Sequence, residues 1–164
     1  MSIRRGLTLG KYAPLHVGHQ FVIETALGEV DEVVVLIYDS PAVTDVPLVR
    51  RANWIRQIYP DVRVIEAWGG PQEVGYTADI KKRHEDYILN LLDRLLITHF
   101  YSSEPYGEHM SEALGAINRI VDLDREVQPI SATMIRENLQ AYHQFLHPIV
   151  YQDLLAWEHS SEAT

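Results

Sequence analysis

The sequence contains no cysteine among its 164 residues. Disulfide bonds, thiolate nucleophiles and cysteine-based zinc sites are therefore excluded. Positive charge is also scarce, because 14 lysine and arginine residues stand against 23 aspartate and glutamate residues, for a formal net charge of −9. Proteins that bind DNA or RNA usually need a basic face to neutralise phosphates, so this balance argues against nucleic acid as the main partner.

Long apolar runs are missing as well. No stretch approaches the roughly 20 apolar residues of a membrane-spanning helix. The basic N-terminus is not followed by an apolar segment long enough for a signal peptide. We therefore expect no membrane partner and a cytoplasmic location. A hydrophobic content of 46% is ordinary for a globular protein. The length predicts one domain over residues 1–159, followed by a disordered tail at 160–164.

Short apolar runs alternate with segments of helical periodicity. The run Val33–Tyr38 is rich in β-branched residues and predicts a strand buried on both faces. Further strands are predicted at 3–9, 62–67, 97–101 and, more weakly, 119–123, with helices around 21–27 and 54–58 and over 77–96. This alternation predicts an α/β fold with a doubly wound parallel sheet, in which ligands bind at the carboxyl ends of the strands. The irregular segments 39–47 and 69–75 follow strands and are candidates for the walls of a site or for a lid over it.

Two histidines follow the first predicted strand, in the segment His16-Val17-Gly18-His19. They stand at a strand-to-helix junction, where both can face the N-terminus of the next helix. Such an N-terminus has unpaired N–H groups and partial positive charge, so it favours an anion such as phosphate. Gly18 allows a close backbone approach because it has no Cβ. The segment predicts a phosphate site, although histidines near a turn are often only surface or core residues.

The spacing excludes two familiar phosphate-binding motifs. A P-loop has four residues between its glycines and a serine or threonine after its lysine. Here Gly6 and Gly10 have three residues between them, and Lys11 is followed by Tyr12. The dinucleotide fingerprint G-x-G-x-x-G is absent altogether.

A second pattern suited to anions lies near the end of the chain, in Ile130-Ser131-Ala132-Thr133-Met134-Ile135-Arg136. Ser131 and Thr133 can cap a helix, and Arg136 is predicted to lie in its first turn. Capping hydroxyls with a guanidinium suit the outer phosphates of a nucleotide. The alternative interpretation is an amphipathic helix that is merely capped and carries an exposed arginine.

Together these two motifs resemble the nucleotidylyltransferase superfamily, whose members carry H-x-G-H near the start and I-S-x-T-x-x-R near the end. The segment Gly10–His19 is similar to the opening of nicotinamide-mononucleotide adenylyltransferases. Segments Ser102–Gly107 and Val121–Arg125 resemble the adenylyltransferase domain of bifunctional NAD-biosynthesis regulator proteins. The resemblance covers about residues 4–150 and implies a Rossmann-like nucleotidylyltransferase fold.

The resemblance implies that ATP and nicotinamide mononucleotide react to give NAD⁺ and pyrophosphate, by in-line attack of the acceptor phosphate on the α-phosphorus. It implies catalytic roles for Lys11, His16, His19 and Arg136. The ATP-binding residues that it implies are Gly10, Gly18, Arg51, Ser103, Glu104, Ser131 and Thr133, with Arg50 as the alternative to Arg51. Mg²⁺ is expected, carried mainly by the phosphates with few protein ligands.

The identity of the acceptor depends on fewer residues. Relatives stack a tryptophan on the nicotinamide ring, and the matching position here is Tyr76, with Trp68 as the alternative. Phosphopantetheine, a flavin nucleotide or an alcohol phosphate used with CTP remain alternative acceptors. A non-catalytic nucleotide sensor is the alternative of another class. Relatives often form homo-oligomers, and the composition neither supports nor forbids that.

Two clusters have simpler interpretations. His143 and His147 are four residues apart and could bind a metal, but no third ligand accompanies them, which favours surface histidines near a helix end. Lys81 and Arg83 lie in a charged stretch of the long predicted helix. They form either a solvated face or a contact with an acceptor phosphate.

Overall fold

The structure is a computed structural model that describes residues 3–71, 75, 77–104, 107–122 and 129–162. Its parallel strands form one sheet in the order β3-β2-β1-β4-β5. The strands are β1 (Arg5–Gly10), β2 (Glu32–Tyr38), β3 (Arg63–Ala67), β4 (His99–Ser102) and β5 (Ile117–Ile120). This arrangement confirms the predicted doubly wound α/β fold.

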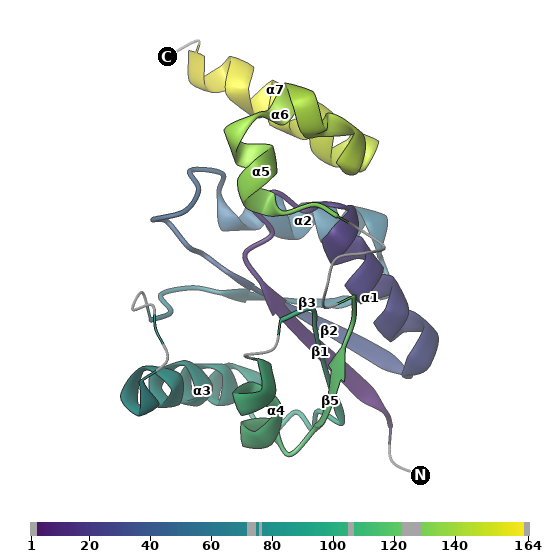
Figure 1. The fold of residues 1–164 in the computed structure, drawn as a ribbon, viewed down its shortest axis with the longest axis vertical. Coiled ribbons are helices and arrows are strands. Elements are labelled where there is room, and N and C mark those ends of the chain that lie inside the picture. Colours follow the sequence, from purple (N-terminus) through teal and green to yellow (C-terminus); the bar gives the residue numbers. More distant parts are fainter. Residues whose placement is uncertain (1–2, 72–74, 76, 105–106, 123–128, 163–164) are drawn as a thin grey trace.

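Helices cover both faces of the sheet (Figure 1). One face packs against α1 (Val17–Glu29) and α2 (Leu48–Ile58), and the other packs against α3 (Ala78–Leu92) and α4 (Glu108–Leu114). After Glu32, strand β2 is an unbroken run of apolar and aromatic residues, because both of its faces are covered. Val35 belongs to the core under α1 and α2, whereas the next residue, Leu36, belongs to the core under α3 and α4.

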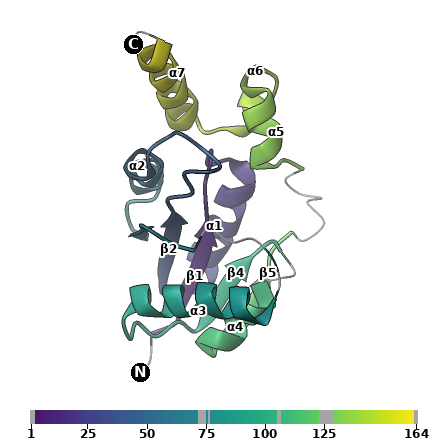
Figure 2. The ribbon, with the colours of Figure 1, turned by 90° about the vertical axis from the view of Figure 1, so that its left-hand side faces the viewer.

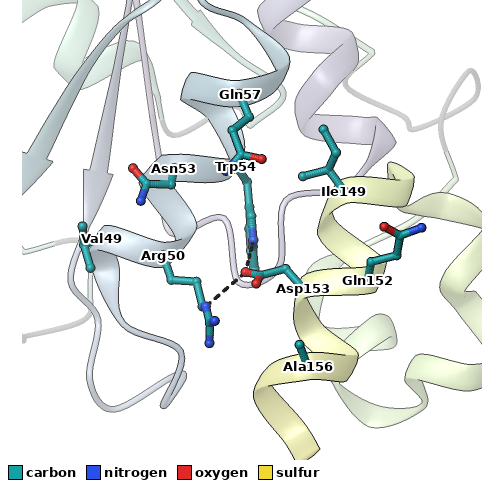
Figure 3. Close-up of a pocket in the computed structure, with 9 residues that line it drawn as sticks. All are labelled: Val49, Arg50, Asn53, Trp54, Gln57, Ile149, Gln152, Asp153 and Ala156. Atoms are coloured by element: carbon teal, nitrogen blue, oxygen red, sulfur yellow. Dashed lines mark hydrogen bonds and ion pairs between the residues drawn. The ribbon is translucent and has the colours of Figure 1, made fainter. Parts of the chain in front are cut away.

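The chain ends in a helical segment made of α5 (Ala132–Glu137), α6 (Leu139–Tyr142), the 3₁₀ helix η2 (His143–Phe145) and α7 (Pro148–Glu162). Figure 2 shows this segment at the end of the molecule away from α3 and α4. Helix α7 packs beside α2, where the Trp54 indole Nε1 donates a hydrogen bond of 2.7 Å to the Asp153 carboxylate. The Arg50 guanidinium pairs with the same carboxylate at 3.1 Å (Figure 3).

Several elements differ from the sequence predictions. Helix α3 ends at Leu92 rather than residue 96, because Asp93 and Arg94 adopt left-handed conformations with φ of 43° and 70°. Strand β5 lies at 117–120 rather than 119–123. Helices α4 and α7 have no counterpart in the prediction. Helix α7 continues through Ser160, where the sequence predicts disorder, and the Ser160 hydroxyl donates to the Ala156 carbonyl at 2.9 Å.

The strand order determines where a ligand can bind. From β1 the chain first adds β2 and β3 on one side, and it then crosses to add β4 and β5 on the other. Neighbouring loops at the carboxyl ends of β1 and β4 therefore diverge, which leaves a crevice at this switch point. Within the described part of the chain, no helix has both the length and the apolar character needed to cross a membrane.

Candidate active site

A cavity of about 740 Å³ lies at the carboxyl ends of the strands, at the switch point. Its walls come from the segments that follow each of the five strands and from helices α1, α3, α4 and α5. Segments from the beginning, the middle and near the end of the chain therefore meet in one place. The predicted site residues that line the cavity are Gly10, Lys11, His16, Gly18, His19, Ser103, Glu104, Ser131, Thr133 and Arg136.

The two histidines cap helix α1 reciprocally. His16 is the N-cap residue, and its Nδ1 accepts a hydrogen bond of 3.0 Å from the Gly18 backbone N–H. The Nδ1 of His19 accepts one of 3.1 Å from the His16 backbone N–H. An imidazole nitrogen that accepts a hydrogen bond carries no proton, so each neutral ring carries its proton on Nε2. Each ring can thus donate a hydrogen bond from Nε2, on its other side.

Ring packing holds the histidines in place. The His16 and His19 rings stack with their centroids 3.8 Å apart, and the Tyr12 ring meets His19 edge-on at 4.7 Å. Gly18 is required because a Cβ there would lie 2.7 Å from Cε1 of His16. Gly10 has a similar role, since a Cβ there would lie 2.8 Å from the Tyr12 ring. The glycines therefore make room for aromatic side chains as well as for a ligand.

Arg136 connects the two ends of the chain. Its Nη1 donates a hydrogen bond of 2.7 Å to the Ala13 carbonyl, in the loop that leads to the histidines. Its Nη2 donates one of 3.3 Å to the Thr133 hydroxyl. The Ser131 hydroxyl is the N-cap of α5 and accepts from the Met134 N–H at 3.3 Å. Helix α5 has only six residues, so Arg136 lies in its last turn rather than in the predicted first turn.

Residues 7–138 match the family model of cytidylyltransferase-like proteins. The chain belongs to this nucleotidylyltransferase family. A search of curated proteins found no match.

Solved structures show the same fold at low sequence identity. A NadR protein in complex with NAD and AMP-PNP is 21% identical with a TM-score of 0.67, over 88% of this chain and 45% of that one. A NadR protein in complex with NR is 23% identical with a TM-score of 0.65, over 88% and 43%. This chain thus spans less than half of either NadR chain. A putative nicotinate-nucleotide adenylyltransferase from Vibrio parahaemolyticus is 15% identical with a TM-score of 0.58, over 93% and 99%.

One residue assigned to ATP from the sequence has a different place in this cytidylyltransferase-like chain. Arg51 is only 1% exposed and does not line the cavity. Its guanidinium donates to the backbone carbonyls of Lys11, Tyr38, Asp39 and Val46. Its hydrogen-bonding capacity is directed at the protein, which corrects the prediction of a direct phosphate contact. The sequence could not show this, because a buried arginine and an exposed one look alike in a helical pattern.

Arg50, the alternative basic residue, and Trp68, one of the two acceptor candidates, also differ from expectation. Arg50 lines a separate groove of about 630 Å³ between α2 and α7 (Figure 3). Trp68 is 58% exposed and does not line the cavity, so the structure does not support it as the stacking residue. Its carbonyl accepts a hydrogen bond from the Tyr87 hydroxyl. Tyr76 lies outside the described residues, and its assignment stays a prediction.

The cavity also has walls that the motifs did not identify. Asp39 lines it from the loop after β2, and its carboxylate accepts from the N–H groups of Ser40 at 2.9 Å and Gly69 at 3.0 Å. His109 lines it from α4, with its Nδ1 2.9 Å from the Glu85 carboxylate. The signal for His109 was its position just after Ser102–Gly107, but α4 itself was not predicted.

In each of the two remaining clusters, Lys81 with Arg83 and His143 with His147, the two residues have different surroundings. Lys81 lines the cavity, whereas Arg83 does not. His143 lies in η2 and stacks on Tyr151 with a centroid distance of 4.8 Å. The Nδ1 of His147 accepts from the Ile149 N–H at 3.1 Å, at the start of α7. The two histidines therefore make local structural contacts rather than facing each other along one helix.

Proposed function

We propose that this chain is an adenylyltransferase that joins ATP and nicotinamide mononucleotide, giving NAD⁺ and pyrophosphate. One observation supports the proposal most strongly. His16 and His19 share a cavity with Arg136, and Arg136 is bonded to the loop that precedes them. Three side chains that can donate hydrogen bonds to phosphate thus come together from distant parts of the sequence.

The proposed chemistry suits the groups in the cavity. The acceptor's phosphate is already anionic at neutral pH, so its attack on the α-phosphorus of ATP needs no general base. The enzyme must instead hold two anions in line and neutralise the charge that develops on the phosphates. We assign that task to the Nε2–H groups of His16 and His19 and to the cations of Lys11 and Arg136. A single donor of this kind is typically worth about 3–4 kcal/mol of transition-state stabilisation.

The choice of nicotinamide mononucleotide is supported by the Ser102–Gly107 and Val121–Arg125 segments and by the likeness to NadR structures, which were solved in complex with NAD and with NR. Ser103 and Glu104 of the first segment line the cavity. We place these two residues, with Ser131 and Thr133, around ATP.

We also propose Mg²⁺ as the counter-ion of ATP, held mainly by phosphate oxygens. Mg²⁺ prefers oxygen ligands and usually keeps several waters, so it can be bound with little help from the protein. Among the residues that the structure describes, no group of three His, Asp or Glu side chains is arranged to hold an ion. Addition of excess EDTA to the assay should abolish turnover, and Mg²⁺ should restore it.

The function is tested by incubating the purified chain with ATP, Mg²⁺ and one acceptor at a time. The acceptors are nicotinamide mononucleotide, nicotinate mononucleotide, phosphopantetheine and a flavin mononucleotide, with CTP plus an alcohol phosphate as a separate reaction. Pyrophosphate release gives the rate, and mass spectrometry identifies the product. We expect NAD⁺ from nicotinamide mononucleotide at the highest kcat/KM.

Each other outcome has a definite meaning. A higher kcat/KM with another acceptor would replace the nicotinamide assignment but keep the nucleotidylyltransferase. Tight binding of ATP in calorimetry without pyrophosphate release from any acceptor would favour the nucleotide sensor.

A further inference from the structure

Arg51 is a buried cation that the proposed chemistry does not use. It lies in the second turn of α2 and is only 1% exposed. Burial lowers the pKa of its guanidinium, and the nearby Asp39 carboxylate opposes that effect. An arginine nevertheless stays charged at neutral pH. A charge removed from water is costly unless its donors are satisfied, so its partners indicate what it is for.

Those partners are backbone carbonyls of loops that form the cavity. Nη1 donates to the Lys11 carbonyl at 2.6 Å and to the Tyr38 carbonyl at 2.9 Å. Nη2 donates to the Asp39 carbonyl at 2.6 Å, and Nε donates to the Val46 carbonyl at 3.0 Å. Lys11 follows β1, and the other three residues come from the end of β2 and the loop after it. The Arg51 side chain therefore links the segment after β1 to the end of β2 and the loop after it.

Asp39 extends this hydrogen-bond network to a third strand, β3. The Asp39 backbone N–H donates to the Ala67 carbonyl at 3.2 Å, and its carboxylate accepts from the Gly69 N–H at 3.0 Å. Ala67 is the last residue of β3, so hydrogen bonds of Arg51 and Asp39 connect the carboxyl ends of β1, β2 and β3. Lys11 and Asp39 line the cavity, whereas Arg51 does not.

The chemistry of the side chain explains why arginine is needed. Its donors are three nitrogens in one plane, and they reach carbonyls on two loops at once. A lysine ammonium carries its three protons on a single nitrogen and cannot span the same set. Lysine at this position would keep the charge but lose some of the hydrogen bonds to the backbone carbonyls.

We infer that Arg51 is a positioning residue, which holds the Lys11 loop and the Asp39 loop in the geometry that the phosphates require. Its effect on turnover passes through Lys11, and it does not contact the nucleotide. The kinetic part of this inference rests on the proposed function, whereas the structural part does not.

The kinetic test compares Arg51→Lys with Arg50→Lys. Arg50 is the neighbouring arginine, but it pairs with Asp153 and faces the groove between α2 and α7 (Figure 3). We expect Arg51→Lys to lower kcat by about tenfold to a hundredfold, the range for a small misplacement of catalytic groups. KM for ATP should change much less, and Arg50→Lys should resemble wild type. A large rise in the KM for ATP with kcat unchanged would instead indicate direct phosphate contact.

A double-mutant cycle tests whether the effect passes through Lys11. Replacing Lys11 with alanine should cost less activity in the Arg51→Lys background than in wild type, because the lysine is already misplaced there. Glu104→Gln should cost the same in both backgrounds, since the hydrogen bonds of Arg51 in the described part of the chain go to Lys11, Tyr38, Asp39 and Val46 and not to the loop after β4. Independent sites are additive and coupled ones are not. Equal costs for Lys11→Ala in both backgrounds would overturn the inference.

Hydrogen exchange supplies a test that needs no activity. In Arg51→Lys, the amides of residues 10–16 and 38–46 should exchange faster than in wild type, while those of α3 stay unchanged. Faster exchange throughout the protein, or no change in the two loops, would contradict a positioning role. If Arg51→Lys does not fold, the neutral variant Arg51→Gln takes its place. If the wild type forms no NAD⁺, the proposed function fails, and the exchange pattern still decides the role of Arg51.

Discussion

Replacing His19 separates the catalytic role proposed for its ring from its structural role. The side chain accepts the His16 N–H through Nδ1, which is the N3 half of a capping box. Glutamine is a natural residue at N3, because its side chain can reach back to the same N–H. His19→Gln should therefore keep the cap and lose the imidazole Nε2–H, because the glutamine amide places its NH₂ donors elsewhere once its oxygen accepts the His16 N–H. His19→Ala loses both the cap and the donor.

The two variants should differ in stability and agree in activity. His19→Ala removes a capping hydrogen bond worth about 1 kcal/mol. It also removes ring contacts with His16 and Tyr12, and such pairs are worth about 0.5–1.5 kcal/mol each. We expect it to be destabilised by about 2–3 kcal/mol, since the two ring contacts are not fully independent. His19→Gln loses the same ring contacts but not the cap, so it should be about 1 kcal/mol more stable than His19→Ala. Loss of one phosphate donor should lower kcat by a factor of about 10²–10³ in both.

Urea unfolding measures the stability difference, and NAD⁺ formation at saturating substrates gives kcat. If His19→Ala kept more than a tenth of the wild-type kcat, His19 would not be a catalytic residue. If the alanine and glutamine variants were equally stable, the capping role of His19 would be wrong. Low activity in the alanine variant alone would show that glutamine replaces histidine, either as the cap or as a donor through its amide NH₂.

Three further predictions follow from other contacts. Gly18→Ala should lower kcat/KM, because the new Cβ would lie 2.7 Å from the His16 ring. The gain of about 1 kcal/mol in helix propensity limits the change in thermal stability. Unchanged kinetics would refute this prediction. Trp54→Phe should lower the unfolding free energy by about 1.5–3 kcal/mol, as it removes a hydrogen bond to the Asp153 carboxylate; a loss below about 0.5 kcal/mol in urea unfolding would contradict it. Hydrogen bonds from Arg119 and Tyr101 lower the pKa of Glu29, so its stabilisation is complete above the unfolded-state pKa of about 4.3 and is lost as the pH falls through the lower folded-state pKa. The stability difference between wild type and Glu29→Gln should accordingly shrink below about pH 4.3, and a constant difference would show that this carboxylate is not involved.

The sequence predicted those parts of the fold that depend on local pattern. Strand β2 was identified almost to the residue, because a strand covered on both faces is apolar throughout. Helix α7 was not predicted, although it docks on α2 through Asp153 and Trp54. Val150, Leu154 and Trp157 are spaced as on one helix face and belong to or pack against the core under α1 and α2. The helix itself could therefore have been predicted, whereas its docking on α2 could not. Helix α3 was predicted too long because its end depends on two residues in the left-handed conformation.

The site was predicted where residues act through a short motif. The segments around His16 and Ser131 were recognised from spacing, and the structure brings both to one cavity. Arg51 was assigned to the phosphates because its position matched a basic residue in relatives. Arg51 is buried because α2 packs against the carboxyl ends of β1 and β2. That packing is a property of the assembled fold and not of the local sequence. Asp39 was missed for the same reason, since its partner Gly69 is 30 residues away.

The capping of α1 shows how this site differs from ordinary helix capping. Serine, threonine, asparagine and aspartate are the preferred N-cap residues, and glutamate or glutamine the preferred N3 residue. Here His16 and His19 occupy both positions and make the same hydrogen bonds through Nδ1. A smaller side chain would cap the helix equally well, so capping alone does not account for two imidazoles. Because Nδ1 is fixed by the backbone, the Nε2 proton of each neutral ring is fixed as well. Helix capping therefore orients the two donors in the absence of any ligand.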